Sequence, residues 1–438
     1  MAAPRIPPAR AAALHVLRAC LREGQDLQPA LDETVRGLSL DQRDAALAAE
    51  LCYGSLRLLA RLDAMCDAFL KAPGKIPARL RDALRVAAYE LHFCDRVPDY
   101  AAVDWAVTFA RSVFGNGLGG LTNAVLRNVA RLGAQAHDPA FYRQDAASHA
   151  AFLARFWSCP EWIVSLWLTQ YGEEGALDYL KAQAAPAPLG LRVNARREGH
   201  AALCDELAAR PGLLLRDDFC LAFAPGSLPL REIETHLAQG RLSRQSAAAQ
   251  AAMHGLDCLE WESGGDSAIW DACAGRGGKT LLLAEQGRAP LLASDVSLRR
   301  IAALPGECRR LGLPRIPALL CQAEEPPLRG WRGTILLDAP CSGLGVLSRR
   351  PDSKWKRTPA ECAGLARLQR HILESALDLV DSGGRVVYLT CTLNRKENQD
   401  VVHALLRQRP DVREEIAYVT PPDGPFGEFF FGVTLRKD

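Results

Sequence analysis

The sequence contains 438 residues with a formal net charge of +2, and 48% of its residues are hydrophobic and 24% charged. These proportions are typical of folded globular proteins and exclude an intrinsically disordered chain, while the length predicts two or three domains. The sequence contains no uninterrupted apolar run of membrane-spanning length. The near-neutral charge excludes a strongly basic chain, although a local basic patch that binds nucleic acid is compatible with it.

Residues 10–131 have the pattern of an almost entirely helical region. Apolar residues recur at helical spacing along residues 12–21, 45–70 and 78–94, and strand-like alternation is absent. Such a stretch can bury one apolar face of each helix against the others. We therefore predict a helical bundle with its own core over residues 1–135.

The following stretch, residues 136–238, has a looser pattern. Its segment 184–188 contains two prolines and is typical of a connector. A strand candidate at 189–194 and a helix candidate at 200–210 follow the connector. This order predicts a linker and a small α+β module.

Strands and helices alternate over residues 239–438. The apolar runs that we expect to be strands occupy residues 267–273, 291–295, 317–321, 333–339, 384–390 and 428–435, the last in a hairpin. Helical patterns at 279–286 and 297–312 separate some of these runs. The alternation predicts a doubly wound, Rossmann-like α/β domain, in which ligands bind beyond the carboxyl ends of the strands.

The first strand of this domain runs into a glycine-rich segment, DACAGRGGKT at residues 271–280, which opens a helix. Free backbone N–H groups at a helix start bind anionic groups, and glycine lets a backbone approach a ligand closely. A Walker A motif would require glycine where Cys273 stands, so a P-loop is disfavoured. A cofactor-binding turn and a purely structural turn both fit this segment alone.

The next strand ends at Asp295. A carboxylate at this position typically binds the ribose hydroxyls of an adenosine-containing cofactor. Alternatively, Asp295 caps the helix predicted to begin near Ser297. Its position after the glycine-rich segment favours the cofactor interpretation.

The fourteen cysteines are scattered, and no pair of them has convincing zinc-ligand spacing. The first residues lack the order of basic, apolar and small residues found in a secretory signal peptide. We therefore expect reduced thiols in the cytoplasm, mostly acting as small core residues, and no bound metal. A reactive cysteine needs an argument of its own.

Two cysteines stand at the carboxyl ends of predicted strands. Cys341 lies in DAPCSGLG at residues 338–345, and Cys391 lies in LTCT at residues 389–392. Thiols at such positions can ionise, and a thiolate is a nucleophile. Each cysteine alone would more often be an inert core thiol, but two beside a glycine-rich segment favour a reactive pair.

These segments resemble the motifs of the NOL1/NOP2/Sun family of RNA (cytosine-5)-methyltransferases. The resemblance is carried by DACAGRGGKT, DAPCSGLG, LTCTLNRKEN at 389–398, RRPDSKW at 349–355, LARLQRHIL at 365–373, GEFFFGVTLRK at 427–437 and LRVN at 191–194. Two further segments, residues 38–63 and 121–131, resemble the NusB-type RNA-binding domain. That pairing is typical of the RsmB (Sun) branch of the family, whose substrate is 16S ribosomal RNA.

The resemblance implies a multidomain chain. Residues 1–135 would form an all-α NusB-like bundle, residues 136–238 a linker and small α+β module, and residues 239–438 a Rossmann-like class I methyltransferase domain. It also implies S-adenosylmethionine as the cofactor and 16S rRNA, or a small-subunit assembly intermediate, as the substrate. We expect a cytoplasmic monomer that binds neither a membrane nor a metal.

The resemblance also implies the roles of individual residues. Cys391 would attack C6 of cytosine as the nucleophile, Cys341 would assist product release, and Asp338 would bind the cofactor or orient the base. The target base would first leave its stack and enter the pocket. The residues implied to hold the cofactor are Cys273, Ala274, Gly275, Arg276, Gly277, Gly278, Lys279, Asp295, Gln322 and Asp338.

Three positions depart from the family pattern. Arg276 replaces a proline, Gln322 stands where an aspartate is expected, and Ser246 stands where the family often has aspartate. Loss of the proline removes a preset φ, and glutamine accepts a hydrogen bond without charge assistance. These departures bear on cofactor affinity rather than on the type of reaction.

Two other functions remain open at this point. An RNA-binding or ribosome-assembly protein could retain the fold with weakened or lost methyltransferase activity, and the altered glycine-rich segment favours this alternative. A DNA (cytosine-5)-methyltransferase would use Cys341 as its nucleophile. The TC motif at Cys391 and the NusB-like region favour RNA over DNA, and both cysteines favour an enzyme.

Overall fold

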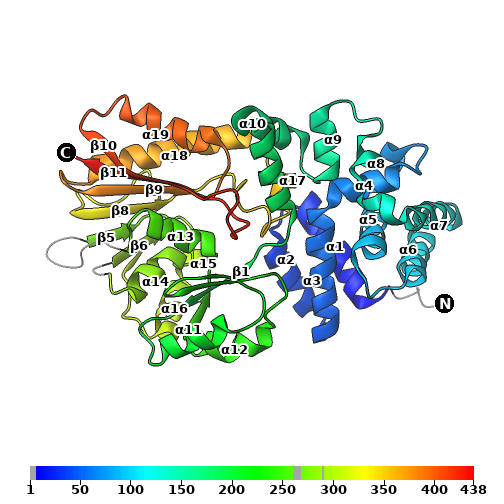
Figure 1. The fold of residues 1–438 in the computed structure, drawn as a ribbon, viewed down its shortest axis with the longest axis horizontal. Helices are drawn as coiled ribbons and strands as arrows, with labels where there is room; N and C mark the ends of the chain where they lie inside the picture. Colours follow the sequence, from blue (N-terminus) through cyan, green and yellow to red (C-terminus); the bar gives the residue numbers. More distant parts are fainter. Residues whose placement is uncertain (1–5, 260–267, 289–290) are drawn as a thin grey trace. The chain divides into compact units, whose positions relative to one another are not determined.

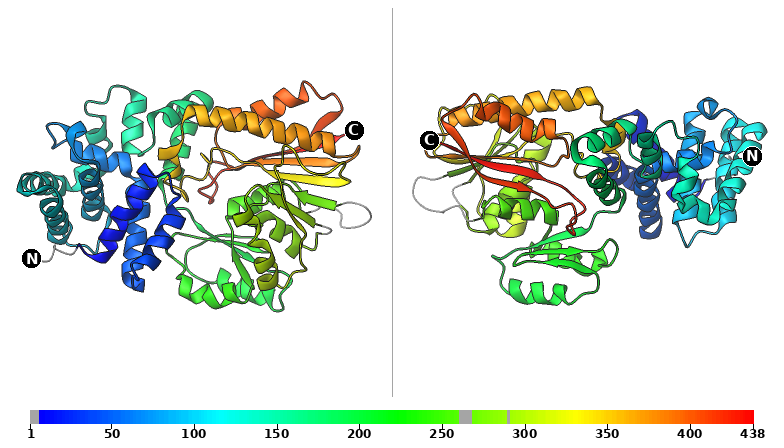
Figure 2. Two further views of the ribbon diagram at one scale, coloured as in Figure 1. Left: turned by 180° about the vertical axis from the view of Figure 1, so that it is seen from behind. Right: turned by 45° about the horizontal axis from the view of Figure 1, so that its top comes forward.

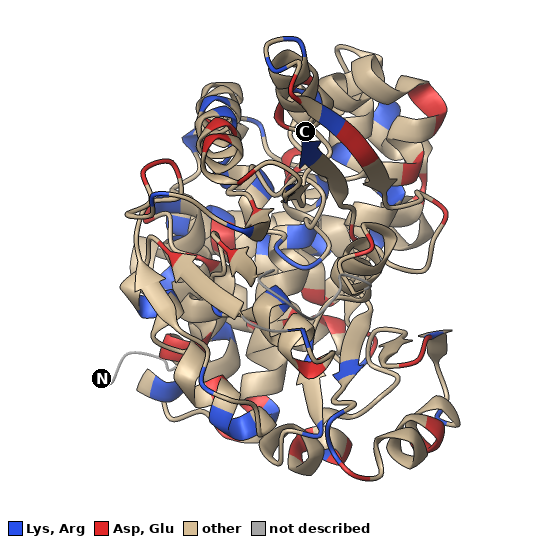
Figure 3. Ribbon diagram, turned by 90° about the vertical axis from the view of Figure 1, so that its left-hand side faces the viewer, with Lys and Arg blue, Asp and Glu red and all other residues tan. Residues whose placement is uncertain are grey.

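The computed structural model describes residues 6–259, 268–288 and 291–438. Within these ranges, no helix is both long enough and apolar enough to cross a membrane. Figure 3 shows that basic and acidic residues are interspersed along the ribbon. Basic and acidic residues therefore occur together on neighbouring elements.

The chain divides into two compact units. The helical unit contains Met1–Ala184 and Arg350–Lys356, and the sheet unit contains Ala185–Arg349 and Arg357–Asp438. The boundaries expected after residues 135 and 238 both fall inside a unit, so the three-part division of the chain stays a prediction.

The helical unit confirms the expected N-terminal bundle. Its α-helices are α1 (Pro8–Arg22), α2 (Leu27–Gly37), α3 (Gln42–Arg57), α4 (Leu59–Asp67), α5 (Ala78–Phe93), α6 (Asp99–Phe114), α7 (Asn116–Arg131), α8 (Pro139–Arg143), α9 (His149–Phe156), α10 (Glu161–Ala184) and α17 (Ser353–Lys356). Leu17 and Leu62 are among its fully buried side chains. The buried carboxylate of Glu90 forms an ion pair with Arg10 at 2.8 Å and accepts a hydrogen bond from Trp105 at 2.6 Å. Helical apolar spacing thus yields a bundle whose interior polar group is satisfied.

Residues 139–184 are more regular than the sequence pattern indicated. Most of them form α8, α9 and α10 rather than a loose region. Gly172 interrupts α10 with a φ of 72°, so the helix consists of two parts. Trp167 before the break and Tyr179 after it are both buried. Because the break shifts the buried face, no single helical period extends through the segment.

The segment Arg350–Lys356 packs with the helical unit although the sequence places it between strands of the sheet unit. Lys354 donates from Nζ to the carbonyl of Arg57 at 2.9 Å, and Trp355 donates from Nε1 to the carbonyl of Leu56 at 2.7 Å. Burial lowers the pKa of Lys354 to about 8. These contacts join residues almost 300 positions apart, which no local pattern predicts.

The sheet unit begins with the expected α+β module. Its elements are β1 (Leu189–Val193), α11 (His200–Ala208), β2 (Leu213–Arg216), β3 (Cys220–Phe223), α12 (Leu230–Ala238) and β4 (Leu242–Arg244). The strands pair antiparallel in the order β2-β3-β1-β4, with the helices of the module along this sheet (green in Figure 2). Leu191 and Phe223 pack with Leu203 of α11 and Ile233 of α12 in one buried cluster.

A seven-stranded sheet forms the rest of the sheet unit. Its elements are α13 (Ala247–Gly255), β5 (Ala268–Asp271), α14 (Gly278–Glu285), β6 (Leu291–Asp295), α15 (Leu298–Ile301), α16 (Leu304–Leu311), β7 (Ala318–Leu320), β8 (Gly333–Asp338), α18 (Pro359–Leu379), β9 (Arg385–Thr390), α19 (Gln399–Leu406), β10 (Val412–Val419) and β11 (Phe431–Lys437). The order is β10-β11-β9-β8-β5-β6-β7. Only the pairs formed by β11 are antiparallel, which confirms the expected late hairpin. Since β6 follows β5 on one side and β8 lies on the other, the topological switch point falls between β5 and β8.

Helices cover both faces of this sheet, as a doubly wound fold requires (Figure 1). Along β8, Ile335 and Leu337 pack in a cluster with α18 and α19, whereas Leu336 packs in a cluster with α13 and α14. Successive strand residues therefore face opposite helical layers. The expected doubly wound, Rossmann-like α/β domain is confirmed.

The helical pattern predicted over residues 297–312 is confirmed, and the structure divides it into two helices. The segment forms two short helices, α15 and α16, with Ala302 and Ala303 between them. Pro305 stands in the first turn of α16. Proline lacks an N–H group and is tolerated at a helix start but not inside a continuous helix.

Candidate functional site

The predicted site residues follow the carboxyl ends of neighbouring parallel strands. The glycine turn, residues 272–277, follows β5, and Asp295 ends β6. Asp338 ends β8, and Cys391 directly follows β9. Because these strands are adjacent and parallel, their carboxyl ends form one edge of the sheet at the switch point. The fold thus brings both cysteines and the glycine turn to the same edge.

The two cysteine sulfurs lie 3.3 Å apart. The backbone amide of Cys391 also donates toward the sulfur of Cys341 at 3.4 Å. The hydrogen bond with Cys391 and burial raise the pKa of the Cys341 thiol well above its usual range. Cys341 is therefore a protonated thiol that can donate a hydrogen bond to the neighbouring sulfur.

Close backbone packing brings the two cysteine loops, residues 339–348 and 391–398, together. Gly345 donates from its amide to the carbonyl of Cys391 at 3.0 Å and accepts from the amide of Phe429 at 2.8 Å. A Cβ atom on Gly345 would lie 2.3 Å from the carbonyl oxygen of Phe429. A glycine is required here because any side chain would push the loops apart.

Lys279 and Asp338 form an ion pair across the switch point. Lys279 Nζ donates to Asp338 Oδ2 at 2.5 Å and lies 5.6 Å from the centre of the Phe430 ring. Burial opposes the charge on Lys279, but the Asp338 carboxylate outweighs it and raises the lysine pKa. About a third of the Asp338 side chain remains exposed. A charged donor and a reachable carboxylate thus lie at the same sheet edge as the thiols.

The glycine turn has the backbone form of a ligand cradle. Gly275 and Gly277 have φ values of 57° and 90°, a region that favours glycine. A Cβ on Gly275 would meet open space, whereas one on Gly277 would lie 2.5 Å from Leu304. Gly277 therefore allows helix packing, and Gly275 leaves room above the turn.

Asp295 links the glycine turn to the segment before α15, while its role toward the cofactor stays a prediction and Ser297, not Asp295, is the N-cap residue of α15. Its Oδ2 accepts from the amide of Gly275 at 2.9 Å, which ties it to the glycine turn. Its Oδ1 accepts from the amide of Ser297 at 2.7 Å, just before α15. Each carboxylate oxygen has a second lone pair that could accept a ligand hydroxyl.

Asp271, at the end of β5, supplies the best test of whether a cationic ligand fits the turn. Its Oδ2 accepts from Thr280 at 2.6 Å, while its buried Oδ1 has no hydrogen-bond partner among the described residues. Burial raises the pKa of Asp271 to about 7. A buried carboxylate at the start of the glycine turn favours a nearby ligand that carries an ammonium or sulfonium group through its charge.

The three departures from the family pattern differ in their surroundings. Arg276 and Gln322 are exposed on the glycine turn and after β7, respectively. Ser246 caps α13 by accepting from the amide of Ala249, and its hydroxyl donates to Glu428. Ser246 therefore has a structural role, and the other two positions can still meet a ligand.

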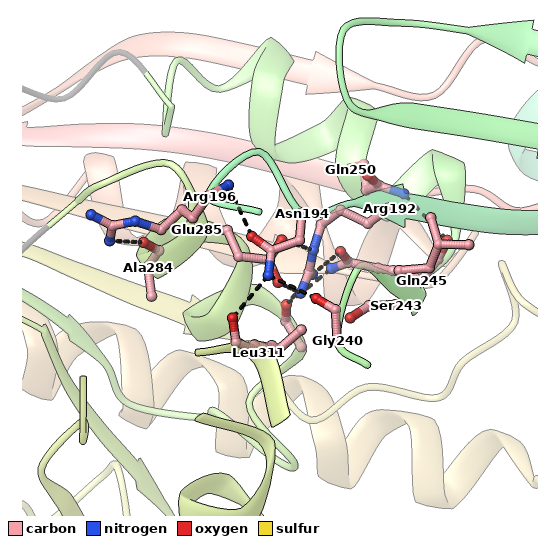
Figure 4. A network of polar contacts seen from close by, with 12 residues as sticks. Arg192, Asn194, Arg196, Gly240, Ser243, Gln245, Gln250, Ala284, Glu285 and Leu311 are labelled. Carbon is pink, nitrogen blue, oxygen red and sulfur yellow. Dashed lines mark hydrogen bonds and ion pairs between the residues drawn. The ribbon is translucent and has the colours of Figure 1, made fainter. Parts of the chain in front are cut away.

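A buried arginine of the small module holds α14, the helix that follows the glycine turn (Figure 4). Arg192 on β1 forms two 2.8 Å contacts with the carboxylate of Glu285, at the last residue of α14. It also donates to the carbonyl of Gly278, the first residue of α14, at 3.0 Å, and to the side chain of Gln245. Since Arg192 contacts both ends of α14, it fixes the helix against the module.

A neighbouring pair of residues reinforces this junction. Asn194 donates to the carbonyls of Gly240 and Leu311 at 2.9 and 3.0 Å, and Arg196 donates to the carbonyl of Ala284 at 3.1 Å (Figure 4). The LRVN segment thus has a physical role that its resemblance alone did not reveal. The sequence offered one signal for Arg192, a charged residue inside an apolar strand, but none for Glu285.

Three family models match parts of the chain. A model described as 16S rRNA methyltransferase RsmB/F matches residues 259–425. A model of the NusB family matches residues 7–131. A model described as the ferredoxin-like domain of RsmF/B-like methyltransferases matches residues 159–212.

Curated relatives match almost the whole chain. The ribosomal RNA small subunit methyltransferase B of Vibrio cholerae serotype O1 is 34% identical over 92% of this chain and 90% of its own. The protein of the same name from Thermus thermophilus is 32% identical over 98% of this chain and 94% of its own. The probable ribosomal RNA small subunit methyltransferase B of Bacillus subtilis is 31% identical over 88% of this chain and 85% of its own.

Solved structures share the fold. The crystal structure of PH0851 has a TM-score of 0.74 at 21% identity and covers 99% of both chains. A methyltransferase homolog protein from Pyrococcus horikoshii has a TM-score of 0.54 at 24% identity and covers 65% of this chain and 98% of its own. The first similarity extends over both units of the chain.

Proposed function

The chain belongs to the RsmB/F family of 16S rRNA methyltransferases, and from that premise we propose that it transfers a methyl group from S-adenosylmethionine to C5 of a cytosine in 16S rRNA. The protein acts in the cytoplasm as a monomer, on 16S rRNA or on a small-subunit assembly intermediate. The observation that carries the proposal is the pair of sulfurs 3.3 Å apart at the switch-point edge, beside the Lys279–Asp338 ion pair.

Cys391 is the nucleophile. The C5 atom of cytosine is a weak nucleophile until a thiolate adds to C6 and moves electron density to C5. The protonated thiol of Cys341 stabilises the Cys391 thiolate by donating a hydrogen bond to it. Burial and the hydrogen bond with Cys391 raise the pKa of Cys341, which suits that thiol to the role of hydrogen-bond donor.

Methyl transfer and product release follow from that addition. When bound, S-adenosylmethionine would supply an electrophilic methyl group, which C5 would accept as the methyl–sulfur bond breaks and leaves its electron pair on the cofactor sulfur. A solvent base then removes the C5 proton, the electron pair of the C5–H bond forms the C5–C6 double bond, and the C6–sulfur bond breaks with its electron pair returning to Cys391. Cys341 assists this release from its position next to the departing sulfur.

The residues of the same sheet edge hold the reactants. The residues proposed to hold the cofactor are Cys273, Ala274, Gly275, Arg276, Gly277, Gly278, Lys279, Asp295, Gln322 and Asp338. We add Asp271, whose buried carboxylate at the start of the glycine turn would favour the positive groups of the cofactor through its charge. Asp338 also orients the extruded base, since part of its carboxylate is exposed while Lys279 holds the rest.

A methyl-transfer assay with the full chain tests the reaction. The probe is in vitro transcribed 16S rRNA with radiolabelled S-adenosylmethionine, followed by nuclease digestion and mass spectrometry of the nucleosides. We expect 5-methylcytidine. No cofactor binding at millimolar concentration in calorimetry would contradict the enzyme and favour the assembly-protein alternative.

Two cysteine variants test the assigned roles. Cys341→Ala should accumulate a covalent RNA–protein adduct on a denaturing gel, because release is slowed. Cys391→Ala should form no adduct and lose about 10⁴-fold or more in rate, the range seen when a nucleophile is removed. The reverse pattern would make Cys341 the nucleophile, as in DNA (cytosine-5)-methyltransferases. Cys204→Ala, which removes a buried thiol on α11 of the small module, is the control.

A further inference from the structure

Glu397 is a fully buried carboxylate close to the two cysteine loops. It ends a short 3₁₀ helix, Arg395–Glu397, that follows Cys391 in the chain, and its exposed fraction is 0%. Burying a carboxylate is costly unless several donors surround it. The contacts of the Glu397 carboxylate therefore indicate the role that this buried side chain has.

The donors to Glu397 come from both sides of the cysteine pair. Its Oε2 accepts from the backbone amide of Ser342 at 2.8 Å and from the side chain of Gln369 at 3.1 Å. Its Oε1 accepts from the side chain of Asn394 at 2.9 Å. Ser342 directly follows Cys341, and Asn394 lies in the loop that contains Cys391. One carboxylate thus connects the two loops.

Further buried hydrogen bonds reinforce the link between the two cysteine loops. The hydroxyls of Ser342 and Thr392, each adjacent to one of the cysteines, lie 2.7 Å apart. Gln369 donates to the carbonyl of Pro340 at 2.9 Å as well as to Glu397. The hydroxyl of Tyr388 donates to the backbone carbonyl of Glu397 at 2.6 Å. The carboxylate is therefore held rigidly and can define the position of its neighbours.

We propose that Glu397 is a positioning residue, whose carboxylate sets the distance and orientation of the Cys341 sulfur relative to Cys391 by binding the Ser342 amide. This proposal rests on the proposed function of the cysteine pair. Glu397 acts through Ser342 and does not touch the substrate. Its negative charge also disfavours ionisation of Cys341, which keeps the proton on that sulfur.

Geometry and charge can be separated by two substitutions. Glu397→Gln keeps the shape and the acceptor for Ser342 and Gln369, but its new amide donor faces the donor group of Asn394. A flip of the Asn394 amide would instead lose the bond that its Oδ1 accepts from the Lys396 amide at 3.2 Å, so this variant loses one hydrogen bond as well as the charge. Glu397→Ala leaves the Ser342 amide and the Gln369 side chain buried without an acceptor. Glu414→Gln, on the exposed face of β10, removes a carboxylate away from the site and serves as the control.

Thiol alkylation with iodoacetamide across a range of pH tests the effect of the Glu397 charge on Cys341, without requiring activity. Trypsin yields peptides 333–349 and 386–395, each with one of the two cysteines, so that mass spectrometry reads each thiol separately. We expect the half-reaction pH of Cys341 to fall by about one unit in Glu397→Gln, because a nearby negative charge is lost. An alkylation profile of Cys341 in Glu397→Gln that matches the profiles of both wild type and Glu414→Gln would overturn the proposal.

Methyl transfer supplies the second measurement. We expect kcat to fall about tenfold in Glu397→Gln and about 100-fold or more in Glu397→Ala, with the KM for S-adenosylmethionine changed less than about twofold. Equal losses in kcat and gains in KM would indicate general damage and overturn the proposal. If wild type forms no 5-methylcytidine, the proposed function fails, while the alkylation profile still decides the role of Glu397.

Discussion

The cysteine loops and the glycine turn lie at one sheet edge. A buried carboxylate holds each of them, but the groups that bind the two carboxylates differ. Glu397 holds the cysteine loops by accepting from amide groups of Ser342, Gln369 and Asn394. Glu285 holds the helix after the glycine turn through a two-pronged ion pair with Arg192. Both carboxylates are almost completely buried.

The two carboxylates differ in the net charge that remains around them. Both hold their neighbours in place, but only one keeps a negative charge. Amide donors satisfy Glu397 but leave its negative charge, which acts on the nearby thiols. The guanidinium of Arg192 neutralises Glu285, so the pair fixes geometry and contributes little net field. A centre that must control a proton benefits from the first arrangement, and a helix that must only stay in place benefits from the second.

Of the changes that test this comparison, loss of Arg192 should have the largest effect on the free energy of unfolding. Arg192→Met leaves Glu285 buried and unpaired, so the free energy of unfolding should fall by about 3–5 kcal/mol. The affinity for S-adenosylmethionine should fall with it, while the alkylation profile of Cys341 stays unchanged. Urea denaturation and calorimetry measure both, with the exposed Arg244→Met as control.

A second variant decides whether the loss comes from the unpaired charge. The double variant Arg192→Met with Glu285→Leu should recover at least half of the lost stability, because both charges are gone. If the single variant loses less than about 1 kcal/mol, the ion pair does not hold α14. A shifted Cys341 profile would show that the two regions are not independent.

The ionisation of Asp271, at the start of the glycine turn, should have an intermediate effect, which is a dependence of the free energy of unfolding on pH. The folded-state pKa of about 7 lies above the ordinary value of 3.8, so the protonated form stabilises the fold. That stability is fully present below pH 3.8 and is lost as the pH rises through 7. Relative to Asp271→Asn, wild type should lose about 1.4 kcal/mol per pH unit between these values.

Urea denaturation of both proteins across that pH range provides the measurement. The exposed Asp423→Asn serves as control and should give a curve parallel to wild type. Saturating S-adenosylmethionine should reduce the loss, because a cationic ligand favours the ionised carboxylate. Parallel curves for Asp271→Asn and wild type would mean that Asp271 is ionised in the fold.

Restoring the family's aspartate at Gln322 should produce the smallest effect. A charged acceptor forms a stronger hydrogen bond with an amine than a neutral one, so Gln322→Asp should lower the dissociation constant for S-adenosylmethionine by about two- to tenfold. Calorimetry measures this constant, and Gln239→Asp at another exposed position is the control. An unchanged constant would show that residue 322 does not contact the cofactor.

The sequence by itself predicted most of the elements and the strand-end positions of the two cysteines. Helical spacing predicted the bundle, and alternating apolar runs predicted the strands of the large sheet. Strand-end positions singled out Cys341 and Cys391, because the strands of a doubly wound sheet present their carboxyl ends at one edge. These inferences succeeded because periodicity and strand-end motifs are local properties of the chain.

Only the tertiary structure decided which distant residues hold those elements in place. Arg192 and Glu285 are 93 positions apart, and Ser342 and Glu397 are 55 apart. Arg350–Lys356 lies in a strand-rich part of the sequence but packs with the N-terminal helices. Such contacts depend on how whole layers pack and on where buried polar groups find partners, and a local pattern carries no record of either.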